Sequence, residues 1–327
     1  MYKSHKNLFE TCCKMLVTAG MLWAGGSTSA QQITRMRCEY GVRPLCIDAA
    51  SPRLTWNIQS AKPLQQSKYR VVVGTDSLQL ASGNGTSVVW DSGVITSDIS
   101  RAVCRDAGLQ SFKRYFWRVT VWDGRGRKIE SSIEPFETAL MNQADWHAVW
   151  ITDSRHRDFE PAPMFRKVFN IDGHRIKRAR FYYSAAAYGA FKLNGRAVSA
   201  DLLNPGYTHY DRRNLYSVYD VTPMLHGGTN VITAVLGNGF YNAIGKVATW
   251  SFDTARWRNR ARMTCLLRVE FDNGRVQEIC SDDTWKTSTG PYLVNNIYAG
   301  DKYDSRLEKT GWEQPSYDDS SWQRAMV

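Results

Sequence analysis

The sequence predicts an all-β protein built from two consecutive β-sandwiches. Hydrophobic and polar residues alternate over short runs, Gly and Asn separate the runs, and no long amphipathic helical pattern appears in the 327 residues. Aromatic residues make up 12% of the chain, and they favour strands and also stack on the apolar faces of sugar rings. A chain of this length has room for about two domains.

Residues 1–30 have the pattern of a signal peptide. Lys3 and Lys6 form a basic start, an apolar run follows over residues 15–24, and Thr28-Ser29-Ala30 supplies the small residues of a cleavage site. The apolar run is far shorter than the roughly 20 residues of a membrane span. We therefore expect cleavage after Ala30, a secreted or periplasmic protein and no membrane span; an uncleaved N-terminal helix is the alternative.

Residues 33–141 predict a fibronectin-type-III-like β-sandwich. The alternating runs that predict its strands are residues 54–58, 69–73, 88–90, 115–122 and 136–138. A turn at residues 123–126, which contains two glycines, ends the clearest of these runs. Several short strands with no helical period between them are typical of this kind of sandwich.

Residues 145–327 predict a larger sandwich of the jelly-roll, galactose-binding-like kind. The runs that predict its strands are residues 179–184, 190–193, 230–236, 261–271 and 276–280. Asn194-Gly195 and Asn273-Gly274 predict tight turns. The single helical signal is at residues 220–225, where Thr222 can cap a helix and Pro223 can occupy its first position.

Five cysteines follow the predicted signal peptide: Cys38, Cys46, Cys104, Cys265 and Cys280. An odd number excludes complete pairing within the chain. Cys265 and Cys280 flank the Asn273-Gly274 turn, and a two-residue hairpin would place them opposite Asp282 and Leu267, a poor geometry for a disulfide. We expect buried thiols, and no Cys/His spacing predicts a zinc site.

The formal net charge is +11, which raises the question of a nucleic-acid partner. The basic residues cluster only at residues 174–180 and 256–262, and neither run belongs to a nucleic-acid-binding motif. We expect these runs to be solvated strand edges and expect no nucleic-acid partner. The alternative is a field that attracts an acidic polysaccharide.

The segment from Leu203 to Thr222 contains four tyrosines, a His, two Arg and two Asp, which invites an active-site interpretation. His209 lies two residues from Asp211, but proximity in sequence alone favours a surface hydrogen-bonding histidine. A glycosidase needs two carboxylates facing each other across a cleft, and spacing along strands does not establish that. No nucleophile elbow, P-loop, HExxH or dinucleotide motif occurs. We expect a sandwich loop with sugar contact.

Ordered motifs along the chain resemble one known family. Pro52-Arg53-Leu54-Thr55-Trp56, Trp90-Asp91-Ser92-Gly93 and Tyr115-Phe116-Trp117-Arg118-Val119 resemble the fibronectin-like module of bacterial α-L-rhamnosidases of glycoside hydrolase family 78. The motifs that resemble the following β-sandwich module are Leu193-Asn194-Gly195 and residues 205–208, 219–222, 237–241 and 298–306. The resemblance covers residues from about Cys38 to the end. It departs at Cys46, where the family has Gly, and at Asp301, where the family tends to have Glu.

The resemblance implies hydrolysis of terminal α-L-rhamnose from plant or pectic glycans, with inversion, by acids in an (α/α)6 barrel downstream of these modules. Such a barrel needs about a dozen helices, which this sequence does not supply. We therefore expect a non-catalytic part of an exported α-L-rhamnosidase that contributes carbohydrate binding, with a truncated following segment and a catalytic barrel encoded downstream or lost. The alternatives are a structural scaffold without ligand, a free-standing rhamnose-binding lectin-like protein and a hydrolase built from these β domains alone.

No catalytic residue is predicted in this chain. The predicted carbohydrate-binding residues are Tyr207, His209, Asn238, Tyr241, Trp250 and Trp257. The resemblance also implies that some modules of the family bind rhamnose with Ca²⁺, held by a carboxylate and backbone carbonyls. Asp201 and Asn204, just before the Pro205-Gly206 turn, are the candidate Ca²⁺ ligands by position, and the alternative is that they only form the turn.

Overall fold

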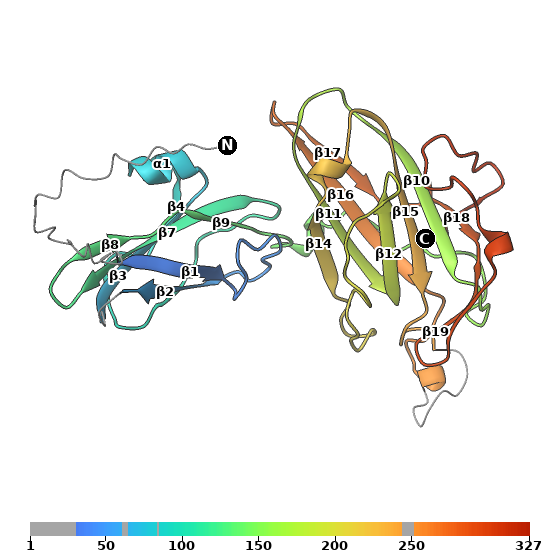
Figure 1. The fold of residues 1–327 in the computed structure, drawn as a ribbon, viewed down its shortest axis with the longest axis horizontal. Coiled ribbons are helices and arrows are strands. Elements are labelled where there is room, and N and C mark those ends of the chain that lie inside the picture. The colour runs from blue at the N-terminus through green and yellow to red at the C-terminus, as the bar shows by residue number, and fades with distance from the viewer. Residues whose placement is uncertain (1–30, 61–64, 84, 244–251) are drawn as a thin grey trace, which may run out of the picture.

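The computed structural model describes residues 31–60, 65–83, 85–243 and 252–327 (Figure 1). It confirms the predicted fold class, because strands form two consecutive sandwiches that lie next to each other. The predicted signal peptide, residues 1–30, lies outside the described residues. Within the described ranges, no helix is long and apolar enough to cross a membrane.

The N-terminal sandwich consists of two antiparallel sheets. The first has the order β1-β2-β6, with β1 Gln32–Cys38, β2 Arg53–Gln59 and β6 Arg101–Val103. The second has the order β4-β3-β7-β8, with β3 Gln66–Gly74, β4 Val88–Asp91, β7 Arg114–Asp123 and β8 Lys128–Glu130; β5 Ile95–Thr96 pairs with β3, and β9 Glu134–Glu137 pairs with β7. Trp56 and Trp117 are buried between the sheets with Val71 and Val119, so the alternation in the sequence does mark the inward face.

The second sandwich packs a six-stranded sheet on a four-stranded one. The six-stranded sheet has the order β13-β12-β15-β10-β18-β21, with β10 Pro163–Ile171, β12 Tyr188–Leu193, β13 Arg196–Ala197, β15 Gly228–Gly237, β18 Lys286–Thr289 and β21 Gln323–Arg324. The four-stranded sheet has the order β14-β11-β16-β17, with β11 Ile176–Ala186, β14 Tyr216–Asp220, β16 Arg262–Phe271 and β17 Val276–Cys280. A separate hairpin joins β19 Tyr292–Asn296 to β20 Gly300–Tyr303.

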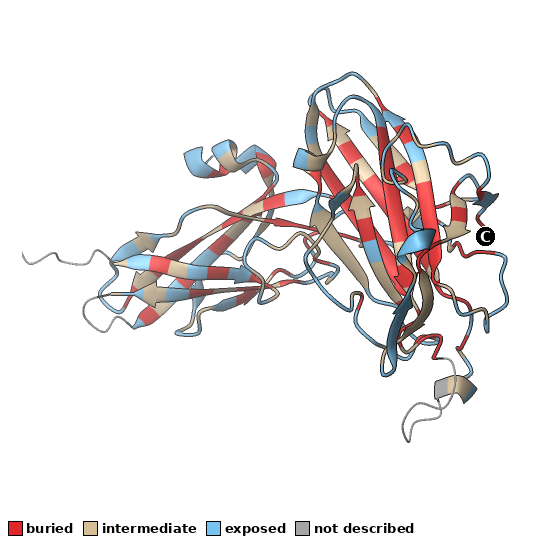
Figure 2. Ribbon diagram, turned by 45° about the vertical axis from the view of Figure 1, so that its right-hand side comes forward, coloured by how far each residue is buried: buried red, intermediate tan, exposed pale blue. Residues whose placement is uncertain are grey.

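The core of this second sandwich lies between its two sheets. Phe165, Ile232 and Phe191 from the six-stranded sheet meet Phe181 and Val269 from the four-stranded one. Figure 2 shows long buried stretches along the strands of this sandwich. On β12 and β15, however, Ala190, Lys192 and Val235 alternate with core residues and stay at least partly exposed on the outward face. The outward face of the six-stranded sheet is therefore available for a site.

The structure adds a helix that the sequence analysis did not predict. The helix α1 spans Ser77–Ser82; the Asp76 side chain accepts hydrogen bonds from the first turn and Gly83 ends it in the left-handed conformation. At the predicted helical position, Thr222–Met224 is a 3-10 turn whose cap position is Val221, so the prediction that Thr222 caps it was wrong. The other 3-10 turns are Gly85–Ser87, Gln143–Asp145, Phe252–Thr254 and Ser305–Leu307.

The hairpin between β16 and β17 has a different register from the predicted one. Leu266 faces Cys280, and the backbone N–H of Phe271 donates to the carbonyl oxygen of Arg275. The turn therefore consists of residues 272–274 and not of Asn273 and Gly274 alone. As a result, Cys265 faces Ser281 instead of Asp282. Cys265 points into the core while Cys280 packs on the opposite face. The five described cysteines are free.

The two basic runs are solvated only in part: Arg175, Lys177 and Arg256 are exposed, as we expected, but other members of the runs are buried. Arg180 and Arg260 are buried, and each makes a bidentate ion pair, Arg180 with Glu137 and Arg260 with Asp153. Burial of a guanidinium is tolerated when a carboxylate and backbone carbonyls satisfy its donors. These two arginines therefore serve as internal ion-pair partners and not as surface charge.

Candidate functional site

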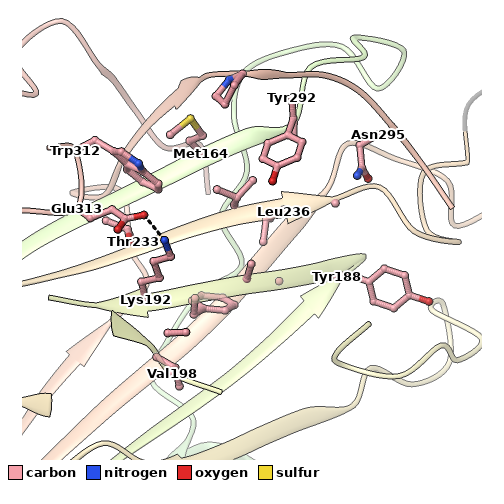
Figure 3. Close-up of a pocket in the computed structure, with 18 of the residues that line it drawn as sticks. Met164, Tyr188, Lys192, Val198, Thr233, Leu236, Tyr292, Asn295, Trp312 and Glu313 are labelled. Carbon is pink, nitrogen blue, oxygen red and sulfur yellow. Dashed lines mark hydrogen bonds and ion pairs between the residues drawn. The ribbon is translucent and has the colours of Figure 1, made fainter. Parts of the chain in front are cut away.

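A groove of about 950 Å³ lies on the outward face of the six-stranded sheet (Figure 3). Its floor consists of side chains that alternate with the core residues: Ala190 and Lys192 on β12, Thr233 and Val235 on β15, and Met164 on β10. A volume of this size is at the upper end of the range for small-molecule sites, which is roughly 300 to 1,000 Å³.

Segments from the end of the chain form one wall of this groove. The β19–β20 hairpin contributes Tyr292 and Asn295, and the loop after it contributes Trp312 and Glu313. The segment 197–204 forms the opposite wall. In Figure 3 Trp312, Glu313 and Lys192 gather at one end, while Tyr188 and Asn295 lie at the other.

The polar end of the groove is built around one ion pair. Lys192 Nζ donates to Glu313 Oε1 at 2.6 Å, and both side chains remain partly exposed. Thr233 lies between Lys192 and Arg166 in the strand register. Its hydroxyl is buried and has no hydrogen-bond partner among the described residues. An unpaired buried hydroxyl is costly, and this one is shielded from the groove, so Lys192 and Glu313 supply the accessible polar groups at this end.

Arg166 fixes the wall that carries Trp312 and Glu313. Its guanidinium donates to the carbonyl oxygens of Trp312 at 3.0 Å and Gln314 at 2.7 Å, and it also pairs with the Asp319 carboxylate. The side chain is 1% exposed. Three partners on one segment orient that segment against the sheet.

Asn295 fixes the hairpin wall in a similar way. Its side-chain oxygen accepts from the backbone N–H of Asn238 at 2.8 Å, and its amide donates to Asp301 at 2.6 Å. The Asn238 side chain donates to the Asn295 carbonyl oxygen at 3.0 Å and accepts from Asn242. Asn238 is 1% exposed, so this predicted sugar ligand holds the wall in place and presents little surface of its own.

The two candidate Ca²⁺ ligands come together in one hydrogen-bond network at the edge of the groove. Tyr219 donates to Asp201 at 2.5 Å, and Asn204 donates to the hydroxyls of Tyr183 and Tyr219 at 2.7 Å each. Asn204 also accepts from Ser217 at 3.0 Å. The hydrogen bond from Tyr219 lowers the pKa of Asp201, which therefore stays ionised at neutral pH.

This network is a poor fit to Ca²⁺, which takes six to eight oxygen ligands. The Asn204 amide oxygen already accepts from Ser217, and Asp201 supplies the one carboxylate of the pair. The described residues contain no group of three or more His, Cys, Asp or Glu that could hold a metal ion. Hydrogen bonding accounts for both side chains, and Ca²⁺ binding at this pair stays a prediction.

Four of the predicted sugar-binding residues meet in or beside an aromatic cluster outside the groove. The rings of His209 and Trp257 are 4.7 Å apart, and Tyr210 contacts Tyr207, Tyr241 and Trp257 edge to face. Tyr241 is buried, whereas Tyr207 is 45% exposed. His209 pairs with Asp211, as their proximity in sequence suggested. Trp250 lies outside the described residues.

Sequence reasoning placed the site at the tyrosine-rich segment and missed the groove. Lys192, Thr233, Trp312 and Glu313 come from three distant parts of the chain. The sequence did carry one signal for the floor, because Lys192 and Thr233 each stand between two apolar neighbours in their strands. Nothing in the sequence pattern places Glu313 next to Lys192, since they are 121 positions apart.

Two protein families match this chain. The Alpha-L-rhamnosidase N-terminal domain matches residues 174–327, and the Rha78A-like, N-terminal immunoglobulin domain matches residues 33–142. The chain belongs to the N-terminal region of the α-L-rhamnosidase family. This confirms the resemblance seen in the motifs, and most of the residues that line the groove lie within the matched range 174–327.

Individual α-L-rhamnosidases agree with this identification. An α-L-rhamnosidase from Formosa agariphila is 33% identical over 309 residues, which cover 85% of this chain and 32% of the relative, and another from Alteromonas sp. is 30% identical over 295 residues, covering 86% and 31%. The solved α-L-rhamnosidase from Dictyoglumus thermophilum superposes with a TM-score of 0.83 at 32% identity, over 90% of this chain and 34% of that one. The chain spans about a third of the length of the curated relatives it matches.

Proposed function

We propose that this chain is a non-catalytic part of an exported α-L-rhamnosidase and that its groove binds rhamnose-containing glycan. The observation that carries the proposal is the groove itself, in which an aromatic wall and an apolar floor meet the Lys192–Glu313 pair. Sugar rings present an apolar face for stacking and hydroxyls that both donate and accept. The groove offers aromatic side chains for the apolar ring face, and a donor, Lys192, and an acceptor, Glu313, for the hydroxyls.

The chemistry of the groove favours binding over hydrolysis. A glycosidase needs a carboxylic acid whose pKa is raised so that it can protonate the leaving group. The pKa of Asp201 is lowered instead, by the hydrogen bond from Tyr219. Each other groove carboxylate also accepts a hydrogen bond from a protein group: Asp301 from Asn295, Glu308 from Tyr303 and Glu313 from Lys192. We expect no release of p-nitrophenol from the aryl α-L-rhamnoside by the purified chain.

Calorimetric titration of the full chain with L-rhamnose and a rhamnose disaccharide tests the binding. Ala190 is exposed on the groove floor, so Ala190→Trp fills the groove without removing a polar group. Val276→Trp adds the same side chain at an exposed strand position of the other sheet and serves as the control. We expect saturable binding by the wild type and the control and its loss in Ala190→Trp.

The scaffold alternative makes the opposite prediction. A scaffold without ligand gives no heat and no thermal shift with either sugar. If Ala190→Trp still binds sugar, the binding site lies outside the groove. Repeating the titration with a chelator tests the Ca²⁺ prediction separately, since Ca²⁺-dependent binding disappears when the metal is removed. We expect the chelator to leave binding unchanged if the groove binds sugar through Lys192 and Glu313 alone.

A further inference from the structure

The charges that line the groove have the opposite sign to the net charge of the protein. The whole chain carries +11, but the groove is lined by two lysines, Lys192 and Lys309, and four carboxylates, Asp201, Asp301, Glu308 and Glu313. The formal charge of the lining is therefore −2. Charges more than about 8 to 10 Å away are screened at physiological salt, so the local carboxylates decide which ligand the groove accepts.

Three buried arginines add no charge to the groove lining. Arg166, which lies opposite Thr233 in the strand register, donates to three carbonyl oxygens and pairs with Asp319. Arg180 and Arg260 are buried in ion pairs away from the groove lining. A positive overall charge therefore does not make this groove a site for acidic sugars.

The polar end has the geometry to bind two neighbouring hydroxyl groups. The Lys192 ammonium has three hydrogens, of which the ion pair with Glu313 uses one, and the Glu313 carboxylate has a second oxygen. One sugar hydroxyl can accept from Lys192, and its neighbour can donate to Glu313.

We infer that the groove selects neutral saccharides with adjacent free hydroxyls and rejects uronic acids. This inference rests on the proposed function and names the ligand class of the same site. A uronate carboxylate would gain Lys192 as a partner, but it would also approach Glu313, which that lysine already neutralises, and the further carboxylates Asp201, Asp301 and Glu308. The acidic pectic partner that the net charge suggests is thus disfavoured at this groove.

A matched pair of ligands tests the inference on the wild-type chain. The first is the galacturonosyl-rhamnose disaccharide, and the second is the same disaccharide after reduction of its carboxyl group to the alcohol. The two differ in one charge and share every other hydroxyl. We expect the reduced, neutral disaccharide to bind at least about fivefold more tightly at physiological salt, where the charges far from the groove are screened, with the difference shrinking as more salt is added.

A variant that removes one carboxylate charge tests whether Glu313 causes the preference for the neutral disaccharide. Glu313→Gln keeps the size and an acceptor oxygen but removes the charge, so the preference for the neutral disaccharide should fall to about twofold or less. Asp283→Asn removes an exposed carboxylate that does not line the groove and should leave the preference unchanged. A thermal melt of each variant checks that it folds, and the wild-type comparison stands even if Glu313→Gln does not fold.

The outcomes separate this inference from the proposed function. If the acidic disaccharide binds as tightly as the neutral one, or more tightly, the selectivity is refuted while sugar binding stands. If neither disaccharide binds, or if Ala190→Trp leaves both affinities unchanged, the proposed function itself fails. A preference that Asp283→Asn abolishes and Glu313→Gln keeps would also refute the inference, because the discriminating charge would then lie outside the groove.

Discussion

Arg166 is the residue on which the wall of the groove depends most directly. It is an arginine on a strand of the six-stranded sheet, 1% exposed, and its donors reach the carbonyl oxygens of Trp312, Gln314 and Pro315. The Asp319 carboxylate also accepts from it and, at 2.7 Å, from Lys286. A planar guanidinium can hold several acceptors at fixed angles, which an ammonium cannot.

Replacing Arg166 should destabilise the fold and weaken the groove together. For Arg166→Leu we expect a loss of about 3 kcal/mol in the free energy of unfolding, because the change removes one partner of a buried ion pair. Sugar affinity should fall as well, since Trp312 and Glu313 lose their anchor. Arg324→Leu is the control, because Arg324 is 77% exposed and lies 4.0 Å from Asp283, and it should change stability by less than about 0.5 kcal/mol.

Denaturant titration measures both variants, and calorimetry measures their affinity for sugar. Equal stability losses in the two variants would contradict the role assigned to Arg166. Unchanged affinity in a folded Arg166→Leu protein would show that the wall does not need this anchor.

Among the secondary-structure elements, the β19–β20 hairpin depends on tertiary contacts most clearly. It forms a two-stranded sheet of its own, and isolated hairpins are marginally stable in water. Asn295 ties it to the end of β15 through Asn238, and a Cβ added at Gly237 would lie 2.9 Å from the Asn295 side-chain oxygen. The glycine therefore leaves the space in which the hairpin docks.

Gly237→Ala should loosen the hairpin without unfolding the sandwich. We expect a cost of about 1 to 3 kcal/mol from the overpacked contact and faster amide exchange over residues 292–303. Gly124→Ala is the matched control, because a Cβ there meets nothing within 4 Å. Hydrogen exchange measured by mass spectrometry would contradict this account if residues 292–303 kept their protection in Gly237→Ala.

At the scale of the whole molecule, a buried ion cluster joins the two sandwiches. Glu137, at the end of β9, accepts from Arg180 Nε at 2.7 Å and from Arg180 Nη2 at 2.8 Å, and Arg114 and Arg178 also lie within ion-pair distance of it. Phe112 packs edge to face on Tyr182 across the same contact. The N-terminal sandwich thus covers part of the outer face of the four-stranded sheet, as the two lobes of Figure 1 illustrate.

This contact should make the two sandwiches unfold together and should weaken in acid. Burial alone would raise the pKa of Glu137, but Arg180, Arg178 and Arg114 outweigh it and hold the pKa below its ordinary value. A lowered folded-state pKa means that the stabilisation is complete above the unfolded value of about 4.3 and is lost as the pH falls through the folded value. Calorimetry should therefore show one melting transition at neutral pH and two in acid.

Glu137→Gln isolates this contribution from that of other carboxylates. We expect a loss of about 3 kcal/mol at neutral pH and separate melting of the sandwiches. The difference in stability between wild type and variant should shrink below pH 4. Glu130→Gln, on an exposed ion pair of the same sandwich, should change stability by less than about 0.5 kcal/mol. A single transition in Glu137→Gln at all pH values would show that the two sandwiches are coupled by other contacts.

The sequence by itself determined the fold class, most of the strands and the family. Strand alternation in 54–58, 69–73 and 115–122 is local, because the period of two reflects which side of each strand is buried. The motifs that carry the family resemblance are also short runs of neighbours, so they can be recognised without knowing where they lie in space. The helix at Ser77–Ser82 had a local signal as well, an Asp before it and a Gly after it, but it is short and was missed.

Only the tertiary structure decided the groove, the partners of the arginines and the hairpin register. Lys192 meets Glu313, Arg166 meets Asp319 and Glu137 meets Arg180 because strands far apart in sequence are neighbours in the sheets, and no local periodicity encodes that pairing. The basic runs looked solvated because composition does not reveal which charge finds a buried partner. The register of Cys265 changed by one residue through the geometry of a single turn, which the two letters Asn-Gly do not fix.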